Sequence, residues 1–131
     1  MICSNDMCSF EIGKDRSPDP RRLGRWTSMT FEGKMNAKIT MITAYCPVNN
    51  TNGLHSAFTQ QLVYINKNKD KHPANHNDYI PQEADSPRKL FEYDIMKYIT
   101  TLQDIGHTVW VLGDFNAEYD ELRSWMAKVH L

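Results

Sequence analysis

Three polar side chains that follow two apolar segments have the residue types needed for hydrolysis. Tyr45 lies near the end of segment 38–46, and Asp114 and Asn116 follow segment 108–112. A carboxylate fixed on a rigid element can accept a proton from water or bind a water held by a metal. An amide both donates and accepts, so Asn116 can orient that carboxylate or contact a phosphate oxygen. The alternative is a structural Asp-x-Asn turn that closes the strand with local hydrogen bonds.

The strands expected on either side of these residues would bring them to one edge of a sheet. Residues 25–31 and 38–46 are rich in β-branched and aromatic side chains and predict a hairpin with its turn at 32–36. The short apolar run at 108–112 predicts a buried strand. Open α/β sheets bind ligands outside the carboxyl ends of their strands. We therefore expect the chemistry at the ends of the second and third strands.

Three helices are expected between and after these strands. Ser86 can cap the clearest one, Pro87 suits its first position, and Gly106 ends it. One apolar face of that helix carries Phe91, Ile95, Tyr98, Ile99 and Leu102. Further helices are expected at 54–65 and 119–129. The resulting order of elements predicts an α/β domain with a mixed sheet, with Trp26 and Trp110 in its core.

Length and composition limit the classes of protein to consider. The chain has 131 residues, 40% hydrophobic and 24% charged, which suits one globular domain. A net charge of −1 excludes a strongly basic chain that coats nucleic acid by charge alone. No apolar run is long enough to cross a bilayer, and residues 1–16 lack the pattern of a secretory signal. Three cysteines do not predict a disulfide framework, so a reducing, intracellular setting is expected.

Four short motifs carry a family resemblance. They are Leu-Gly-Asp-Phe-Asn at 112–116, Leu-Gly-Arg-Trp at 23–26, Ile-Thr-Ala-Tyr-Cys-Pro at 42–47 and Ser-Pro-Arg-Lys-Leu-Phe at 86–91. In this order, they resemble the endonuclease/exonuclease/phosphatase superfamily, which includes deoxyribonuclease I and apurinic endonucleases. The combination is similar to the endonuclease domains found beside reverse transcriptases in retroelements. The resemblance covers residues 23–131, with 1–22 as an irregular N-terminal segment and 66–87 as a polar loop insertion.

The resemblance implies a four-layer α/β sandwich and hydrolysis of DNA phosphodiesters with Mg²⁺ or Mn²⁺. Asp114 would orient or deprotonate the attacking water, and Asn116 would be its partner near the scissile phosphate. The phenol of Tyr45 would lie beside the same phosphate. The resemblance further implies a larger polyprotein with reverse transcriptase as the setting, no membrane, and an intracellular location that includes the nucleus.

Two more residues are candidates for contact with the substrate. Arg25 would be structural or would contact a backbone phosphate of the DNA. The family often has an asparagine directly after its tyrosine-x-proline, where this sequence has Val48. Asn49 is the neighbour that would substitute for that asparagine.

The chain departs from the family in segments that the catalysis uses. We find no match to the strand with the metal-binding glutamate, or to the serine-aspartate-histidine segment. No metal ligand is therefore assigned, and we expect a fragment of a nuclease domain that is inactive as this chain alone. The apolar sheet face normally covered by the other half should then be exposed or covered by something else.

Two alternative functions remain on the same fold. One is a non-catalytic module that binds nucleic acid or protein, with Arg21, Arg22 and Arg25 touching phosphate. With a net charge of −1, its binding to nucleic acid should be weak and lost quickly with salt. The other is a phosphatase of the same superfamily, for which no lipid-facing segment or basic loop gives support.

Overall fold

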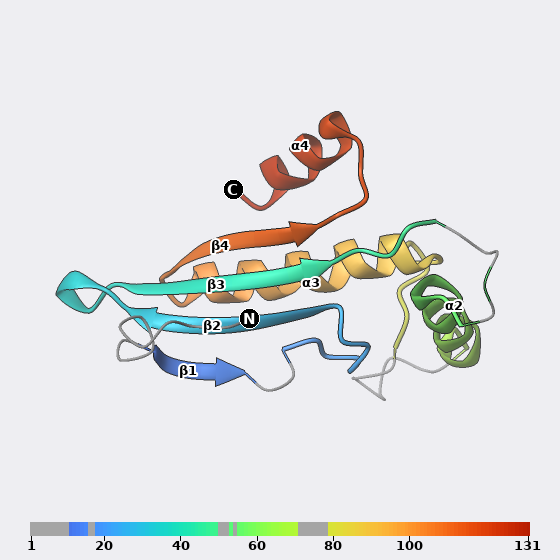
Figure 1. Ribbon diagram of the computed structural model, residues 1–131, viewed down its shortest axis with the longest axis horizontal. Coiled ribbons are helices and arrows are strands. Elements are labelled where there is room, and N and C mark those ends of the chain that lie inside the picture. Colours follow the sequence, from blue (N-terminus) through green and yellow to red (C-terminus); the bar gives the residue numbers. More distant parts are fainter. Residues whose placement is uncertain (1–10, 16–17, 50–52, 54, 71–78) are drawn as a thin grey trace.

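The chain forms an α/β domain around one mixed sheet. The computed structural model describes residues 11–15, 18–49, 53, 55–70 and 79–131. Four strands lie side by side in the order β1 (Glu11–Asp15), β2 (Trp26–Glu32), β3 (Lys38–Tyr45) and β4 (His107–Asp114). The first three are antiparallel neighbours, and β4 lies parallel to β3 (Figure 1). The α/β class and the mixed sheet predicted from the sequence are confirmed. Within segment 1–22, which was expected to be irregular, residues Glu11–Asp15 form the edge strand β1.

The hairpin of β2 and β3 has the turn that the sequence predicts. A short 3₁₀ turn, η1 (Lys34–Asn36), joins the strands, and Trp26 and Glu32 pair in register with Ala44 and Lys38. Met35 and Asn36 have positive φ angles of 57° and 60°, which close the connection. This long, regular pairing holds β3 in place, and with it Tyr45 at the carboxyl end of the strand.

Helices α2 (Ala57–Asn68) and α3 (Pro87–Asp104) form the crossover that makes β3 and β4 parallel. Ser86 caps α3 as predicted, because its hydroxyl accepts a hydrogen bond from the backbone N–H of Lys89. Helix α2 begins later than expected, where the Ser56 side chain caps it. A crossover helix runs antiparallel to the strands it joins, so α3 begins beside the carboxyl ends of β3 and β4 (Figure 1).

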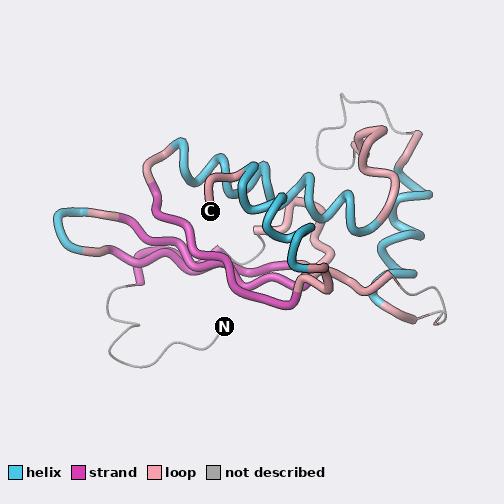
Figure 2. The backbone as a smooth tube through the Cα atoms, turned by 90° about the horizontal axis from the view of Figure 1, so that it is seen from above, coloured by secondary structure: helices cyan, strands magenta, loops and turns pink. Residues whose placement is uncertain are grey.

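One face of the sheet carries the core. Helices α3 and α4 (Tyr119–Lys128) lie on the same side of the sheet (Figure 2). Side chains from both helices and from β2, β3 and β4 form the main hydrophobic cluster, which includes Trp26, Ile42, Phe91, Ile95, Ile99, Val109 and Trp125. None of the helices in the described part of the chain is long and apolar enough to cross a membrane.

The opposite face of the sheet is open at its β4 edge. Trp110 is 58% exposed and Leu112 is 49% exposed, and both alternate with the core-facing Val109 and Val111. The core position expected for Trp110 is therefore wrong, because residues of odd and even number in β4 point to different faces. The expectation of an exposed apolar sheet face is confirmed at these positions.

Candidate active site

The carboxyl ends of β3 and β4 bring Tyr45 and Asp114 together. The two residues are register partners in the parallel pair, so their Cα atoms lie on adjacent strands about 4.8 Å apart. The backbone N–H of Cys46 donates to the carbonyl oxygen of Asp114 at 2.8 Å, which continues the pairing past the strand ends. Tyr45 is 43% exposed, and Asp114 is exposed beside it. A phenol and a carboxylate therefore share one accessible edge of the sheet.

Gly113 makes this close pairing possible. Its φ of 155° is rare for residues with a side chain, and a Cβ placed there would overlap the carbonyl oxygen of Ala44. In the structure, the atoms that approach it closely belong to the neighbouring strand β3.

The turn after β4 is built on Asn116. Its backbone is left-handed, with a φ of 46°, and its N–H donates to Asp114 Oδ1 at 3.2 Å. Its side-chain Nδ2 donates to the carbonyl oxygen of Cys46 at 2.8 Å. The amide therefore ties the ends of β3 and β4 together, while Nδ2 keeps a second proton. The local Asp-x-Asn hydrogen bond of the structural alternative is present, but Asp114 stays exposed.

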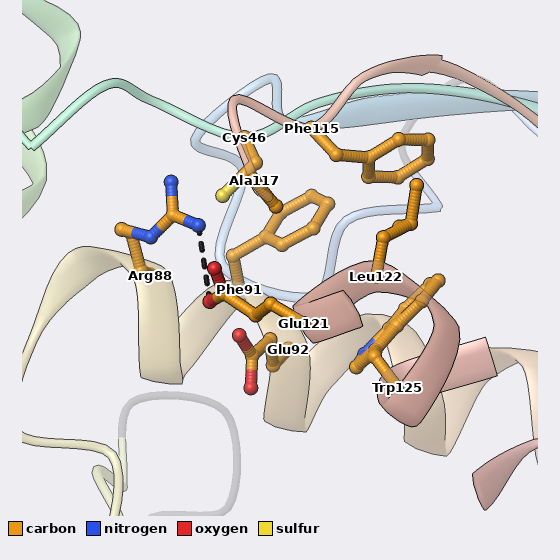
Figure 3. Close-up of a pocket in the computed structure, with 9 residues that line it drawn as sticks. All are labelled: Cys46, Arg88, Phe91, Glu92, Phe115, Ala117, Glu121, Leu122 and Trp125. Carbon is orange, nitrogen blue, oxygen red and sulfur yellow. Dashed lines mark hydrogen bonds and ion pairs between the residues drawn. The ribbon is translucent and has the colours of Figure 1, made fainter. Parts of the chain in front are cut away.

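A small hollow lies on the helix side of this turn, between α3 and α4 (Figure 3). It is lined by Cys46, Ala117, the apolar side chains of Phe91, Phe115, Leu122 and Trp125, and the charged side chains of Arg88, Glu92 and Glu121. Burial raises the pKa of the Cys46 thiol to about 11. The thiol is thus protonated at neutral pH and is not an activated nucleophile.

Glu92 gives the hollow a testable pH dependence. Burial, and then the charge of Glu121, raise its pKa above the ordinary 4.5. Because the pKa of Glu92 is higher in the folded state than in the unfolded state, the folded protein is favoured while Glu92 is protonated, below pH 4.5. This contribution of Glu92 to stability is lost as the pH rises through the pKa that Glu92 has in the folded state. We expect Glu92→Gln to raise the free energy of unfolding at pH 7 by about 0.5 kcal/mol, with no gain at pH 4.

Urea titrations at the two pH values measure this difference, and Glu83→Gln, at an exposed glutamate before α3, is the control. An equal gain at pH 4 and pH 7 would contradict the role of the charge.

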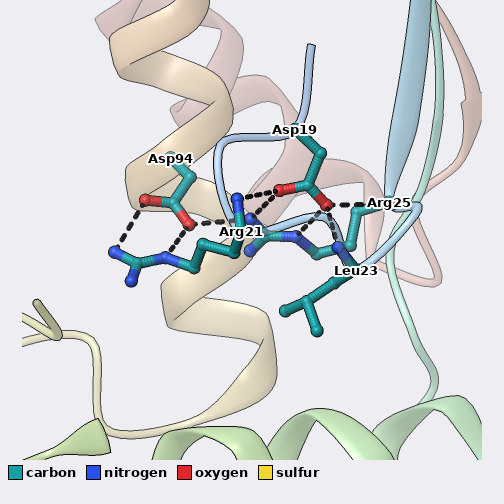
Figure 4. A network of polar contacts seen from close by, with 5 residues as sticks. All are labelled: Asp19, Arg21, Leu23, Arg25 and Asp94. Carbon is teal, nitrogen blue, oxygen red and sulfur yellow. Dashed lines mark hydrogen bonds and ion pairs between the residues drawn. The ribbon is translucent and has the colours of Figure 1, made fainter. Parts of the chain in front are cut away.

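Arg25 does not belong to the exposed edge. Its side chain is fully buried, and Nη2 contacts Asp19 Oδ1 at 2.6 Å and Asp94 Oδ2 at 2.8 Å (Figure 4). Arg21 binds the other side of Asp94. Of the two roles expected for Arg25, the structure shows the structural one. The buried guanidinium is not accessible to a backbone phosphate of DNA.

Asn49 is exposed in a bend after β3, and no hydrogen bond to the rest of the described chain holds it. The structure thus brings Tyr45, Asp114 and Asn116 together, and no hydrogen bond within the described residues joins Asn49 to them. Sequence reasoning missed Arg88, which donates to the carbonyl oxygen of Asn116 at 2.7 Å. The signal that could have found it is its place in the first turn of the crossover helix.

The donor set does not fit a complete metal site. Among the residues that the structure describes, no group of three histidine, cysteine or acidic side chains gathers in one place. Asp114 supplies one carboxylate to the edge, whereas Mg²⁺ is held by one or two carboxylates together with waters and substrate oxygens. The catalytic roles considered below are therefore those of Tyr45, Asp114 and Asn116 themselves, with no metal ligand assigned.

Comparison with known proteins adds no family to these observations. No protein-family model matches the chain, and neither a curated protein nor a solved structure matches it. A function for this chain is therefore inferred from its fold and from the residues at the carboxyl ends of β3 and β4.

Proposed function

We propose that the chain carries the tyrosine, aspartate and asparagine of a phosphodiesterase active site, of the endonuclease/exonuclease/phosphatase kind and acting on DNA. The observation that carries the proposal is the register of Tyr45 with Asp114 at the carboxyl ends of two parallel strands. In open α/β sheets, this edge is where ligands bind. Both side chains are exposed there, so a phosphodiester can reach them.

Each side chain has a role that its chemistry allows. The carboxylate of Asp114 accepts a proton from the attacking water or orients it. The phenol of Tyr45 donates a hydrogen bond to a phosphate oxygen that gains negative charge in the transition state. Asn116 holds one carboxylate oxygen through its backbone N–H, and its second Nδ2 proton is a further donor to phosphate.

The open sheet face supports the fold proposed with this function. Trp110 and Leu112 lie on the side of β4 opposite α3 and α4, and both are largely exposed. A second sheet packed there would cover them and give four layers, with helices outside and two sheets inside. In this proposal the chain is part of a larger nuclease domain, as in proteins that also contain reverse transcriptase. In this proposal the chain alone is inactive, because its described residues do not complete a metal site.

Nicking of supercoiled plasmid tests the proposal. The assay uses this chain, and a longer chain that contains it, with Mg²⁺ or Mn²⁺. Asp114→Asn should lower the nicking rate of the longer chain by about a hundredfold. Asp104→Asn, at an exposed aspartate at the end of α3, is the matched control and should not change the rate. Equal nicking rates for the two variants, or no nicking by the longer chain, would contradict the proposal.

The same open face favours a second candidate, a non-catalytic module that binds another protein. An exposed tryptophan and leucine on neighbouring positions of one strand face suit an apolar partner better than phosphate. In that case, binding is insensitive to salt and Trp110→Ser removes it, whereas Asp114→Asn has no effect. DNA binding through phosphate contacts should instead fall steeply as salt rises.

A further inference from the structure

We propose that Arg88 is a positioning residue for the turn formed by Asp114 and Asn116. Its Nη1 donates to the backbone carbonyl oxygen of Asn116 at 2.7 Å, and Asn116 in turn binds the Asp114 carboxylate. That this turn matters for catalysis rests on the proposed function, in which Asp114 acts on the attacking water. The hold of Arg88 on the turn rests on geometry alone and can be tested separately.

The guanidinium joins three elements at one point. Arg88 lies in the first turn of α3, and it reaches both the turn after β4 and Glu121 in the first turn of α4. Its Nη2 contacts Glu121 Oε1 at 3.2 Å (Figure 3). The side chain is only 17% exposed, which restricts its motion. Arginine presents its donors in a rigid planar fork, so the two contacts fix each other.

Asn116 needs such a hold because its backbone is in an unfavourable region. A left-handed φ of 46° is tolerated by asparagine but is less favourable than an extended or right-handed backbone. Three contacts keep Asn116 there, through its N–H to Asp114, its Nδ2 to Cys46 and its carbonyl oxygen to Arg88. Without the Arg88 contact, the peptide after Asn116 is free to rotate. The hydrogen bond that orients Asp114 then weakens.

The position of Arg88 follows from local sequence. Ser86 caps α3 and Pro87 begins it, so the direction in which the next residue leaves the helix is fixed. Lys89, the following residue, is exposed and pairs with Asp85 at 2.9 Å. Two adjacent cations on one helical turn thus have different partners, and Lys89 provides a control for loss of charge.

Nuclear magnetic resonance of the full 131-residue chain tests whether Arg88 holds the turn. The readouts are the exchange rate of the Cys46 backbone amide, which bonds to Asp114, and the shifts of the Asn116 side-chain amide. Arg88→Gln should raise the Cys46 exchange rate about tenfold and shift the Asn116 signals towards those of a free amide. Arg88→Lys should recover part of the protection, since lysine can bind one oxygen but not two.

Two further variants separate the possible causes. Lys89→Gln removes a charge from the same turn of α3, and it should leave both signals as in the unchanged chain. Glu121→Gln weakens the ion pair but keeps the carbonyl contact, so protection of Cys46 should change less than in Arg88→Gln. Unchanged exchange in Arg88→Gln, or the same increase in Lys89→Gln, overturns the proposal.

Cleavage by the longer chain gives the functional readout. Arg88→Gln should lower kcat about tenfold with little change in KM, because Arg88 does not touch the substrate. A loosened turn with unchanged kcat overturns the positioning role but leaves the roles of Tyr45 and Asp114. If the unchanged longer chain does not cleave, the proposed function fails, and the exchange measurements still decide whether Arg88 holds the turn.

Discussion

Replacement of Arg25 by alanine is expected to lower the free energy of unfolding by about 3–5 kcal/mol. The side chain is fully buried and binds two carboxylates, Asp19 and Asp94, at 2.6–2.9 Å. Its removal leaves both carboxylates with fewer partners in a buried site. For a domain of this size, the loss is a large share of the total stability.

The network around Arg25 explains the size of this effect. Asp19 also accepts hydrogen bonds from the backbone N–H groups of Arg21, Leu23 and Arg25, so one carboxylate organises the whole turn before β2 (Figure 4). Burial works against the charge of Asp19, but the hydrogen bond and the charge of Arg25 outweigh it and lower the pKa of Asp19. Asp94 connects the same turn to the middle of α3. Removing Arg25 therefore weakens the attachment of β2 to the helix layer.

Guanidinium titration followed by circular dichroism measures the expected loss. Arg123→Ala is the control, since it removes the same charge from an exposed position on α4. The control should change the free energy of unfolding by less than about 0.5 kcal/mol. A midpoint for Arg25→Ala that equals the control would show that the network contributes little to stability.

Much of the fold follows from local rules that the sequence displays. The Ser86-Pro87 pair marks the start of α3, and the β-branched segment 38–46 marks β3. The location of the candidate site follows from a general property of α/β sheets rather than from any one residue. That property placed Tyr45 and Asp114 at one edge, where the register of β3 with β4 pairs them.

The remaining features depend on contacts between distant parts of the chain. Arg25 is buried and Arg22 is exposed, although both belong to the basic stretch before β2. Arg25 binds Asp19 within that stretch and also Asp94, a residue of α3 that is distant in the sequence. The core position predicted for Trp110 was wrong for a related reason. Whether its side of β4 is buried depends on which face of the sheet α3 covers. Local patterns give the alternation of a strand but not the face that becomes the core.

Gly113→Ala is expected to lower the free energy of unfolding by about 3 kcal/mol, by combining backbone strain with steric overlap. The added Cβ would overlap the backbone carbonyl of Ala44, and a backbone atom of the inner strand β3 cannot move aside as a flexible side chain can. Strand β4 must therefore separate from β3 near its carboxyl end. Tyr45 and Asp114 would then lose their register.

Gly106→Ala is the matched comparison, because Gly106 also has a positive φ, 84°, but a Cβ there meets no atom within 4 Å. It should cost only the strain of a left-handed residue, about 1–2 kcal/mol. The difference between the two variants measures the steric overlap at Gly113. The Cys46 amide, which bonds to Asp114, should exchange faster in Gly113→Ala but not in Gly106→Ala. Equal stability and equal exchange in both variants would mean that the site does not depend on the close approach of β3 and β4.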